Sequence, residues 1–128
     1  MDADEHRCLN NVTKMVIGAS FEVANVLGTG FLEKVYEKAL AVELRRRGLV
    51  VEEQKPLSVS YKGDVVGEYF ADLLVEHRVI VELKYVDAFA SEHIAQCLNY
   101  LKAAGLHVAL LINFKHPRID YKRIVHDF

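Results

Sequence analysis

The chain has 128 residues, of which 52% are hydrophobic and 27% charged, and its formal net charge at pH 7 is −2. This composition is typical of one globular domain with a single core, and it excludes a long disordered tail. A pI of about 6.3 excludes binding of nucleic acid through bulk positive charge, so any such binding must be local. We therefore expect residues 1–128 to form one domain.

Targeting signals and paired cysteines are missing from the sequence. No apolar run approaches the length of a membrane-spanning helix, and the amino terminus lacks the pattern of a signal peptide. Cys8 and Cys97 are far apart, and they form neither a disulfide framework nor a redox motif. Together these observations predict a cytoplasmic protein that does not engage a membrane.

Two amphipathic helices are predicted in the first part of the chain. Apolar residues recur at three- and four-residue steps from Leu9 to Leu27, and Gly28-Thr29-Gly30 ends this pattern. A second helix is expected from near Phe31 to Arg47, with Gly48 just past its carboxyl end. The expected core side of the second helix consists of Leu32, Val35, Tyr36, Ala39 and Leu40.

Three strands should follow and form an antiparallel unit. Residues 49–61 are rich in strand formers, and Pro56 favours an edge position or a bulge. Lys62-Gly63-Asp64 reads as a turn into a strand that ends near Glu76. The third strand is expected over Val79–Lys84.

The last part of the chain predicts a crossover connection. A helix over Ala90–Ala104 stops at Gly105, and the continuous apolar run His107–Asn113 is typical of a buried strand. Such a strand should run parallel to the third one through a right-handed crossover. The tail from Lys115 is expected to add a short final strand or a strap, and the predicted order is α-α-β-β-β-α-β.

Two carboxylates should meet in the hairpin between the second and third strands. If Glu76-His77-Arg78 is a three-residue loop, Val75 pairs with Val79, and Asp72 then lies opposite Glu82. The same register turns the apolar residues Leu73, Val75, Val79, Val81 and Leu83 into a core, which supports it independently. Because cross-strand partners lie roughly 5 Å apart at Cβ, both carboxylates could bind one hard cation such as Mg²⁺.

Lys84 shares the face of Asp72 and Glu82, and together they suggest metal-assisted phosphodiester hydrolysis. A cation would polarise a phosphoryl oxygen and acidify a water, while a lysine orients or deprotonates that water. An ordinary surface hairpin with a Glu-Lys pair is the alternative, because an E-x-K triplet alone is common.

Polar residues on two helices could support this site. Ile94, Cys97, Leu98 and Leu101 account for core packing of the third helix, whereas Gln96 and Tyr100 share another face with His93. Gln96 and Tyr100 could bind a phosphate, a water or Lys84. On the second helix Glu33 borders the apolar stripe, so it is either a third ligand, a partner of Lys84 or an ordinary solvated side chain.

These residues form four motifs that resemble the GxxExxY family of the PD-(D/E)XK nuclease superfamily. Gly30, Glu33 and Tyr36 match the family's naming motif, and Asp72 with Glu82-Leu83-Lys84 matches the catalytic D…(D/E)xK pattern. Gln96 and Tyr100 resemble the Q-x-x-x-Y helix motif of RecB-like nucleases, and the run Leu110–Phe114 resembles the family's late strand.

The resemblance implies a restriction-endonuclease-like fold of the α/β (α+β) class. It has an α-β-β-β-α-β core, a mixed central sheet flanked by helices, and here one extra N-terminal helix. It also implies a Mg²⁺- or Mn²⁺-dependent nuclease site with Asp72, Glu82, the Leu83 carbonyl and Glu33 as metal ligands. Lys84 would be the catalytic lysine, supported by Gln96 and Tyr100.

The expected partner is nucleic acid, with DNA favoured over RNA, and a homodimer is plausible for so small a chain. A non-catalytic nucleic-acid or protein interaction module on the same fold is the alternative function, although a buried carboxylate pair would repel phosphate in a simple binding module. Hydrolysis of a small phosphoester is a third option.

Overall fold

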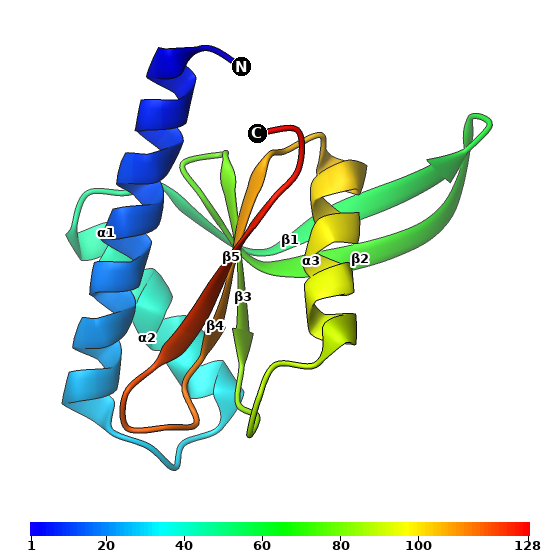
Figure 1. The fold of residues 1–128 in the computed structure, drawn as a ribbon. Coiled ribbons are helices and arrows are strands. Elements are labelled where there is room, and N and C mark those ends of the chain that lie inside the picture. The colour runs from blue at the N-terminus through cyan, green and yellow to red at the C-terminus, as the bar shows by residue number, and fades with distance from the viewer.

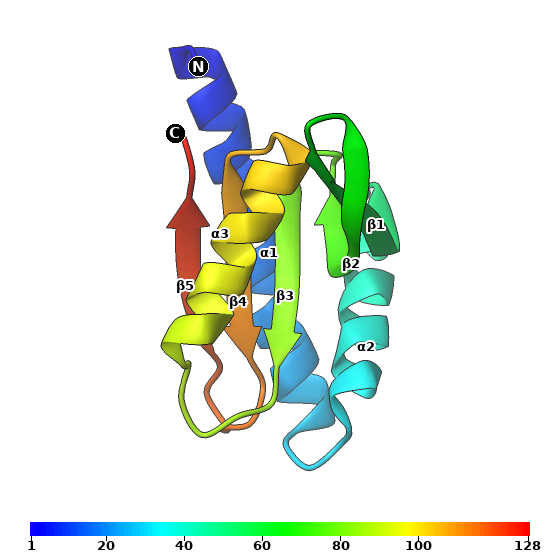
Figure 2. The same ribbon diagram turned by 90° about the vertical axis from the view of Figure 1, so that its right-hand side faces the viewer.

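Five strands form one mixed sheet in the order β1-β2-β3-β4-β5; Figure 1 labels the elements and Figure 2 shows the strands in this order. The computed structural model describes all residues from Met1 to Phe128. In chain order the elements are α1 (Ala3–Leu27), α2 (Glu33–Arg46), β1 (Val51–Tyr61), β2 (Asp64–Val75), β3 (Val79–Lys84), α3 (Ser91–Ala104), β4 (Val108–Asn113) and β5 (Asp120–Val125). The predicted α+β core is confirmed, with β1, β2 and β3 antiparallel and β4 parallel to β3.

Helices cover both faces of the sheet. Helices α1 and α2 share one cluster of buried side chains with the sheet, and α3 packs with the other face in a second cluster (Figure 2). The central strands β3 and β4 are buried on both faces, which explains why β4 is apolar without alternation. The five predicted hairpin residues from Leu73 to Leu83 all lie in the first cluster.

The two amino-terminal helices differ from the prediction at their starts. Helix α1 begins at Ala3 rather than Leu9, because the Asp2 side chain accepts a hydrogen bond from the Glu5 N–H at 2.8 Å and caps the helix. Helix α2 begins at Glu33, and Leu32 lies before it in extended conformation with 80% of its surface exposed. Leu32 and Val35 are therefore wrong as core residues, and Glu37 is buried instead.

The tail from Lys115 contains a strand rather than a strap. Strand β5 pairs antiparallel with β4 from Val108 opposite Val125 to Asn113 opposite Asp120. It is one edge strand of the sheet and β1 is the other, which confirms the edge position predicted from Pro56. No helix combines the length and apolar character that crossing a membrane requires.

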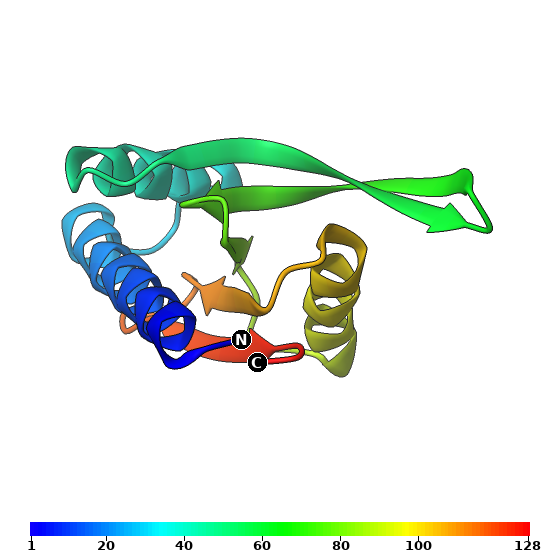
Figure 3. The same cartoon turned by 90° about the horizontal axis from the view of Figure 1, so that it is seen from above.

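The hairpin of β1 and β2 extends beyond the rest of the sheet, and we call residues 56–70 the arm (Figures 1 and 3). Its tip is the predicted turn at Lys62-Gly63, and its register shifts between Val59 and Ser60. Gln54, at the base of β1, has a left-handed φ of 50° and lies between the paired residues Glu53 and Lys55. The arm thus leaves the sheet next to Asp72, which lies on the adjoining part of β2.

Candidate active site

The carboxylate pair lies where β2 separates from β3. Their backbone ladder pairs Val75 with Val79 and ends at Leu73 opposite Val81, so the predicted register is confirmed. One residue further, the Asp72 N–H donates to Glu82 Oε1 at 2.8 Å, and the Leu83 N–H donates to Asp72 Oδ2 at 2.9 Å. The two carboxylates therefore accept hydrogen bonds from the backbone N–H groups that the β2–β3 ladder does not pair.

Burial makes this pair electrostatically unfavourable without a cation. Glu82 is 3% exposed, and its burial together with the negative charge of Asp72 raises its pKa to about 8. Burial also raises the pKa of Asp72, and the nearby charge of Glu37 adds to this effect. Two hard carboxylate groups held side by side in such surroundings fit a Mg²⁺ or Mn²⁺ ion, which would supply the missing positive charge.

Lys84 ends β3 beside this pair without forming an ion pair. Its Nζ donates to Gln96 Oε1 at 3.4 Å, and no carboxylate oxygen lies within ion-pair distance of it. Its charge nevertheless lowers the pKa of both Asp72 and Glu82, although burial outweighs it in each case. The ammonium group is thus close to the carboxylates and available to a ligand.

Helix α3 brings Gln96 and Tyr100 to the same place. Gln96 Nε2 donates to the Tyr100 hydroxyl at 3.0 Å, while its Oε1 faces Lys84. Tyr100 is buried in the second core cluster, so the prediction that it lies outside the core stripe is wrong. Burial raises the pKa of the Tyr100 hydroxyl to about 12. His93 instead caps α3, with Nδ1 accepting from the Ala90 N–H at 3.0 Å.

Glu33 lies at the first position of α2 with an exposed side chain. Partial loss of hydration and the charge of Asp72 raise the pKa of Glu33, while the charge of Lys84 lowers it. Glu33 therefore interacts electrostatically with the residues of the site. No three His, Cys, Asp or Glu side chains are grouped tightly enough to hold a metal ion by themselves. Glu33 as an accessory ligand therefore stays a prediction.

The loop before α2 is held by two tyrosine hydroxyls. Tyr36 donates to the Gly28 carbonyl at 2.6 Å and accepts from the Phe31 N–H at 3.3 Å, and the Gly30 N–H donates to the Tyr85 hydroxyl at 2.8 Å. Gly30 has a φ of 107°, which a residue with a Cβ rarely adopts. Gly30 and Tyr36 therefore fix the start of α2 and, with it, Glu33.

Glu37 and Gln54 are two polar residues next to the site that the sequence does not single out as functional. Gln54 Nε2 donates to Glu37 at 3.0 Å and weakly to Asp72 Oδ1 at 3.4 Å, and Lys34 forms an ion pair with Glu37 at 2.8 Å. Glu37 lies four and seven residues before the buried Ala41 and Leu44, so helical spacing could have shown that it faces inward. No local pattern marks Gln54.

Asn113 fixes the segment that follows Lys84. It is buried opposite Lys84 in the parallel ladder, where Oδ1 accepts from the Val86 N–H at 3.1 Å and Nδ2 donates to the Val86 carbonyl at 2.7 Å. The Phe114 N–H also donates to the Lys84 carbonyl at 3.0 Å. The Asn113-Phe114 pair thus holds the carboxyl end of β3, where the lysine is displayed.

Sequence comparison assigns the chain to a family. The PD-(D/E)XK nuclease superfamily matches residues 10–124, so the chain belongs to this superfamily. Its members generally depend on divalent metal ions. A search of curated proteins gives no significant match.

Solved structures show the same fold at low sequence identity. The crystal structure of SSO0001 has a TM-score of 0.59 and 17% identity over 74% of this chain and 50% of that one. An alkaline exonuclease from Laribacter hongkongensis, LHK-Exo, has a TM-score of 0.50 and 14% identity over 84% and 76% of the two chains. The crystal structure of LHK-Exo in complex with dAMP has a TM-score of 0.50 and 13% identity over 90% of this chain and 83% of that one. The match thus spans half the length of SSO0001.

Replacing Tyr36 by Phe should loosen the start of α2. The change removes the hydroxyl that bonds Gly28 and Phe31 but keeps the ring, which stacks on Phe114 at 5.0 Å. We expect the free energy of unfolding to fall by about 1 kcal/mol, measured by urea denaturation. Tyr121→Phe, which alters a half-exposed tyrosine on β5, is the control and should have no effect. Equal stability of the two variants would contradict the assigned role of Tyr36.

The raised pKa of Glu82 should make metal-free stability depend on pH. The folded chain binds this proton up to about pH 8, whereas the ordinary pKa is 4.5. Stability from this group is therefore complete below the ordinary pKa and is lost as pH rises through the folded value. Glu82→Gln keeps an oxygen for the Asp72 N–H and cannot ionise, so its stability relative to wild type should increase with pH in chelator. Parallel stability curves across this range would show that the Glu82 pKa is not raised.

Proposed function

We propose that the chain is a metal-dependent nuclease that hydrolyses phosphodiester bonds of DNA, or of RNA, at the site around Asp72 and Glu82. The observation that carries this proposal is the pair of adjoining carboxylates, the buried Glu82 and the partly buried Asp72, beside a lysine without an ion-pair partner. A chain that kept the fold only for binding would gain nothing from two carboxylates packed side by side, because carboxylate charge repels phosphate. Membership of a nuclease superfamily supports the same function.

The ligands we propose for Mg²⁺ or Mn²⁺ are the carboxylates of Asp72 and Glu82 and the Leu83 carbonyl, with Glu33 as an accessory ligand. When bound, the ion would polarise a phosphoryl oxygen and acidify a water. Lys84 Nζ would orient that water, take up its proton or stabilise charge on the phosphoryl oxygens. Gln96 would direct Lys84 Nζ, and the buried Tyr100 hydroxyl would hold Gln96.

Within the superfamily we place the chain in the GxxExxY family. Gly30, Glu33 and Tyr36 match the naming motif. The hydrogen bonds of Gly30 and Tyr36 hold the loop before α2, which supports a structural role for these two motif residues. DNA is our first expectation for the substrate. LHK-Exo, an exonuclease of the same fold, has been crystallised with dAMP, which supports a nucleotide ligand. The homodimer and the cytoplasmic location stay predictions.

Metal binding should stabilise the folded protein through Asp72 and Glu82. Adding Mn²⁺ or Mg²⁺ to the chelator-treated protein should raise its melting temperature, because the ion binds the folded state. Asp72→Asn, which keeps an oxygen for the Leu83 N–H, should remove most of this shift. Glu92→Gln, an exposed change on α3, is the matched control and should keep it. The same metal response in Asp72→Asn and wild type would exclude this metal site.

Nuclease activity should require both the metal and Lys84. Wild type is incubated with single-stranded DNA, linear and circular duplex DNA, and RNA, each with Mg²⁺, Mn²⁺, Ca²⁺ or chelator. At least one substrate should be cut with Mg²⁺ or Mn²⁺ and none with chelator. Lys84→Ala should reduce turnover roughly a hundredfold or more while the metal-induced melting shift persists. Cleavage that survives in Asp72→Asn, or tight binding without any cleavage, would favour the interaction module.

A further inference from the structure

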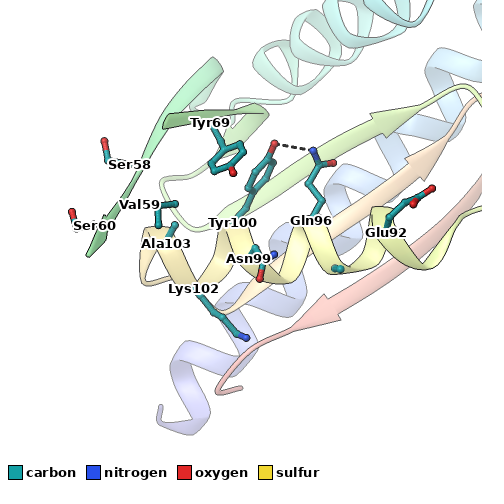
Figure 4. A pocket seen from close by; sticks show the side chains of 11 residues that line it. Ser58, Val59, Ser60, Tyr69, Glu92, Gln96, Asn99, Tyr100, Lys102 and Ala103 are labelled. Carbon is teal, nitrogen blue, oxygen red and sulfur yellow. Dashed lines mark hydrogen bonds between the residues drawn. The ribbon is translucent and has the colours of Figure 1, made fainter. Parts of the chain in front are cut away.

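A groove of about 810 Å³ lies between the arm and α3, next to the candidate active site (Figure 4). The arm contributes Val59 and Tyr69, and α3 contributes Ala95, Gln96, Asn99 and Tyr100. This volume lies within the range of pockets that bury small molecules. The groove is therefore large enough for part of a ligand.

The groove surface is aromatic and carries no net charge. Tyr69 is 49% exposed, and its ring lies 5.8 Å from that of Tyr100, tilted by 46°. Glu92 and Lys102 are the only charged residues in the lining, one of each sign, and Figure 4 shows Lys102 extending away from Tyr69. A phosphate would find no excess of positive charge here, whereas a neutral planar ring could stack on Tyr69 and bond the Asn99 amide.

Gln96 links the groove to the proposed chemistry. It lines the groove, its Nε2 donates to the Tyr100 hydroxyl, and its Oε1 accepts from Lys84 Nζ. A ligand that places a phosphate beside Lys84 therefore has the groove directly next to that phosphate. Nucleobases are the planar, uncharged groups that lie next to the phosphates of a nucleic acid.

We propose that this groove binds an unpaired nucleobase of the strand that is cut, so that single-stranded nucleic acid or a frayed end is the preferred substrate. The inference rests on the proposed nuclease function and adds the strandedness of its substrate. A base inside a duplex could enter only after it leaves the stack, which costs a few kcal/mol. Stacking on an aromatic ring tolerates every base, so little sequence preference is expected from the groove.

The chain offers a matched pair of substitutions for the test. Tyr69 and Phe70 are neighbours on β2 with 49% and 50% exposure, and only Tyr69 lines the groove. Binding of a single-stranded oligonucleotide with one 2-aminopurine base is measured by anisotropy and fluorescence quenching, with Ca²⁺ in place of Mg²⁺. Tyr69→Leu should weaken this binding at least about fivefold and reduce quenching, whereas Phe70→Leu should match wild type. Affinity for a blunt duplex should not change in either variant.

A second variant protects the test against a local folding effect. Ala95→Leu adds bulk to the groove from the exposed side of α3 and removes no contact, so it should weaken single-strand binding as Tyr69→Leu does. Equal single-strand binding by wild type, Tyr69→Leu and Ala95→Leu would overturn the inference. An equal loss of duplex binding would also overturn it. So would a dimer in solution that Tyr69→Leu dissociates, because a second copy would then occupy the groove.

Failure of this inference is distinguishable from failure of the proposed function. The binding measurement involves no cleavage, so a Tyr69-dependent preference for single strands without any nuclease activity would keep the groove and reject the enzyme. Cleavage that needs Asp72 and Lys84 but is the same in Tyr69→Leu and Phe70→Leu on single strands would keep the enzyme and reject the groove.

Discussion

The separation of β2 from β3 at Asp72, on the arm side of Leu73, is the constraint on which the site depends. At that point the Asp72 and Leu83 N–H groups lose their ladder partners and are paired by the carboxylates of Glu82 and Asp72. Buried backbone donors without partners would be costly, so the two side chains have a structural duty in addition to any chemistry. Because β2 pairs with β3 only from Leu73 onward, the earlier part of β2 can lie in the arm, which forms one wall of the groove.

The charges of the site are arranged at a cost to stability. The buried Glu82 and the partly buried Asp72 lie side by side, and the neighbouring ammonium of Lys84 bonds to a neutral amide rather than to either of them. A direct ion pair would stabilise the metal-free fold but would occupy the lysine. Glu37 adds a third negative charge nearby, partly balanced by Lys34 and by the amide of Gln54. Such uncompensated burial of charge is typical of sites that work with a cation.

Periodicity predicts most of the fold because each element buries a regular stripe or alternates across the sheet. The hairpin register followed from Val75 and Val79, since a one-residue slip would turn five apolar residues to the opposite face. The start of α2 was harder to predict, because Leu32 and Val35 look like core residues until the extended Leu32 is placed outside the helix. Helical spacing places Tyr100 on a polar face, whereas in the structure its ring is buried in the core and only its hydroxyl reaches the polar Gln96.

The candidate site also contains residues that local sequence patterns predict and residues that only the tertiary fold brings together. Asp72, Glu82 and Lys84 are brought together by strand pairing, which the sequence encodes locally, and Gln96 and Tyr100 follow from helical spacing. Glu37 and Gln54 approach Asp72 through the packing of α2 against the base of the arm, and that contact depends on the tertiary fold. The left-handed conformation of Gln54 has no sequence signal, because glutamine is not a residue that favours it.

Pro56 has a consequence for how the molecule behaves in concentrated solution. The arm exposes Val65, Val66 and Phe70 along a strand pair whose outer edge, β1, is open, and such edges recruit other chains into continuous sheets. Proline has no N–H to offer an incoming strand, and the register shift at Val59 and Ser60 bends the same edge. Both features oppose the pairing of a further strand with the exposed edge of the arm.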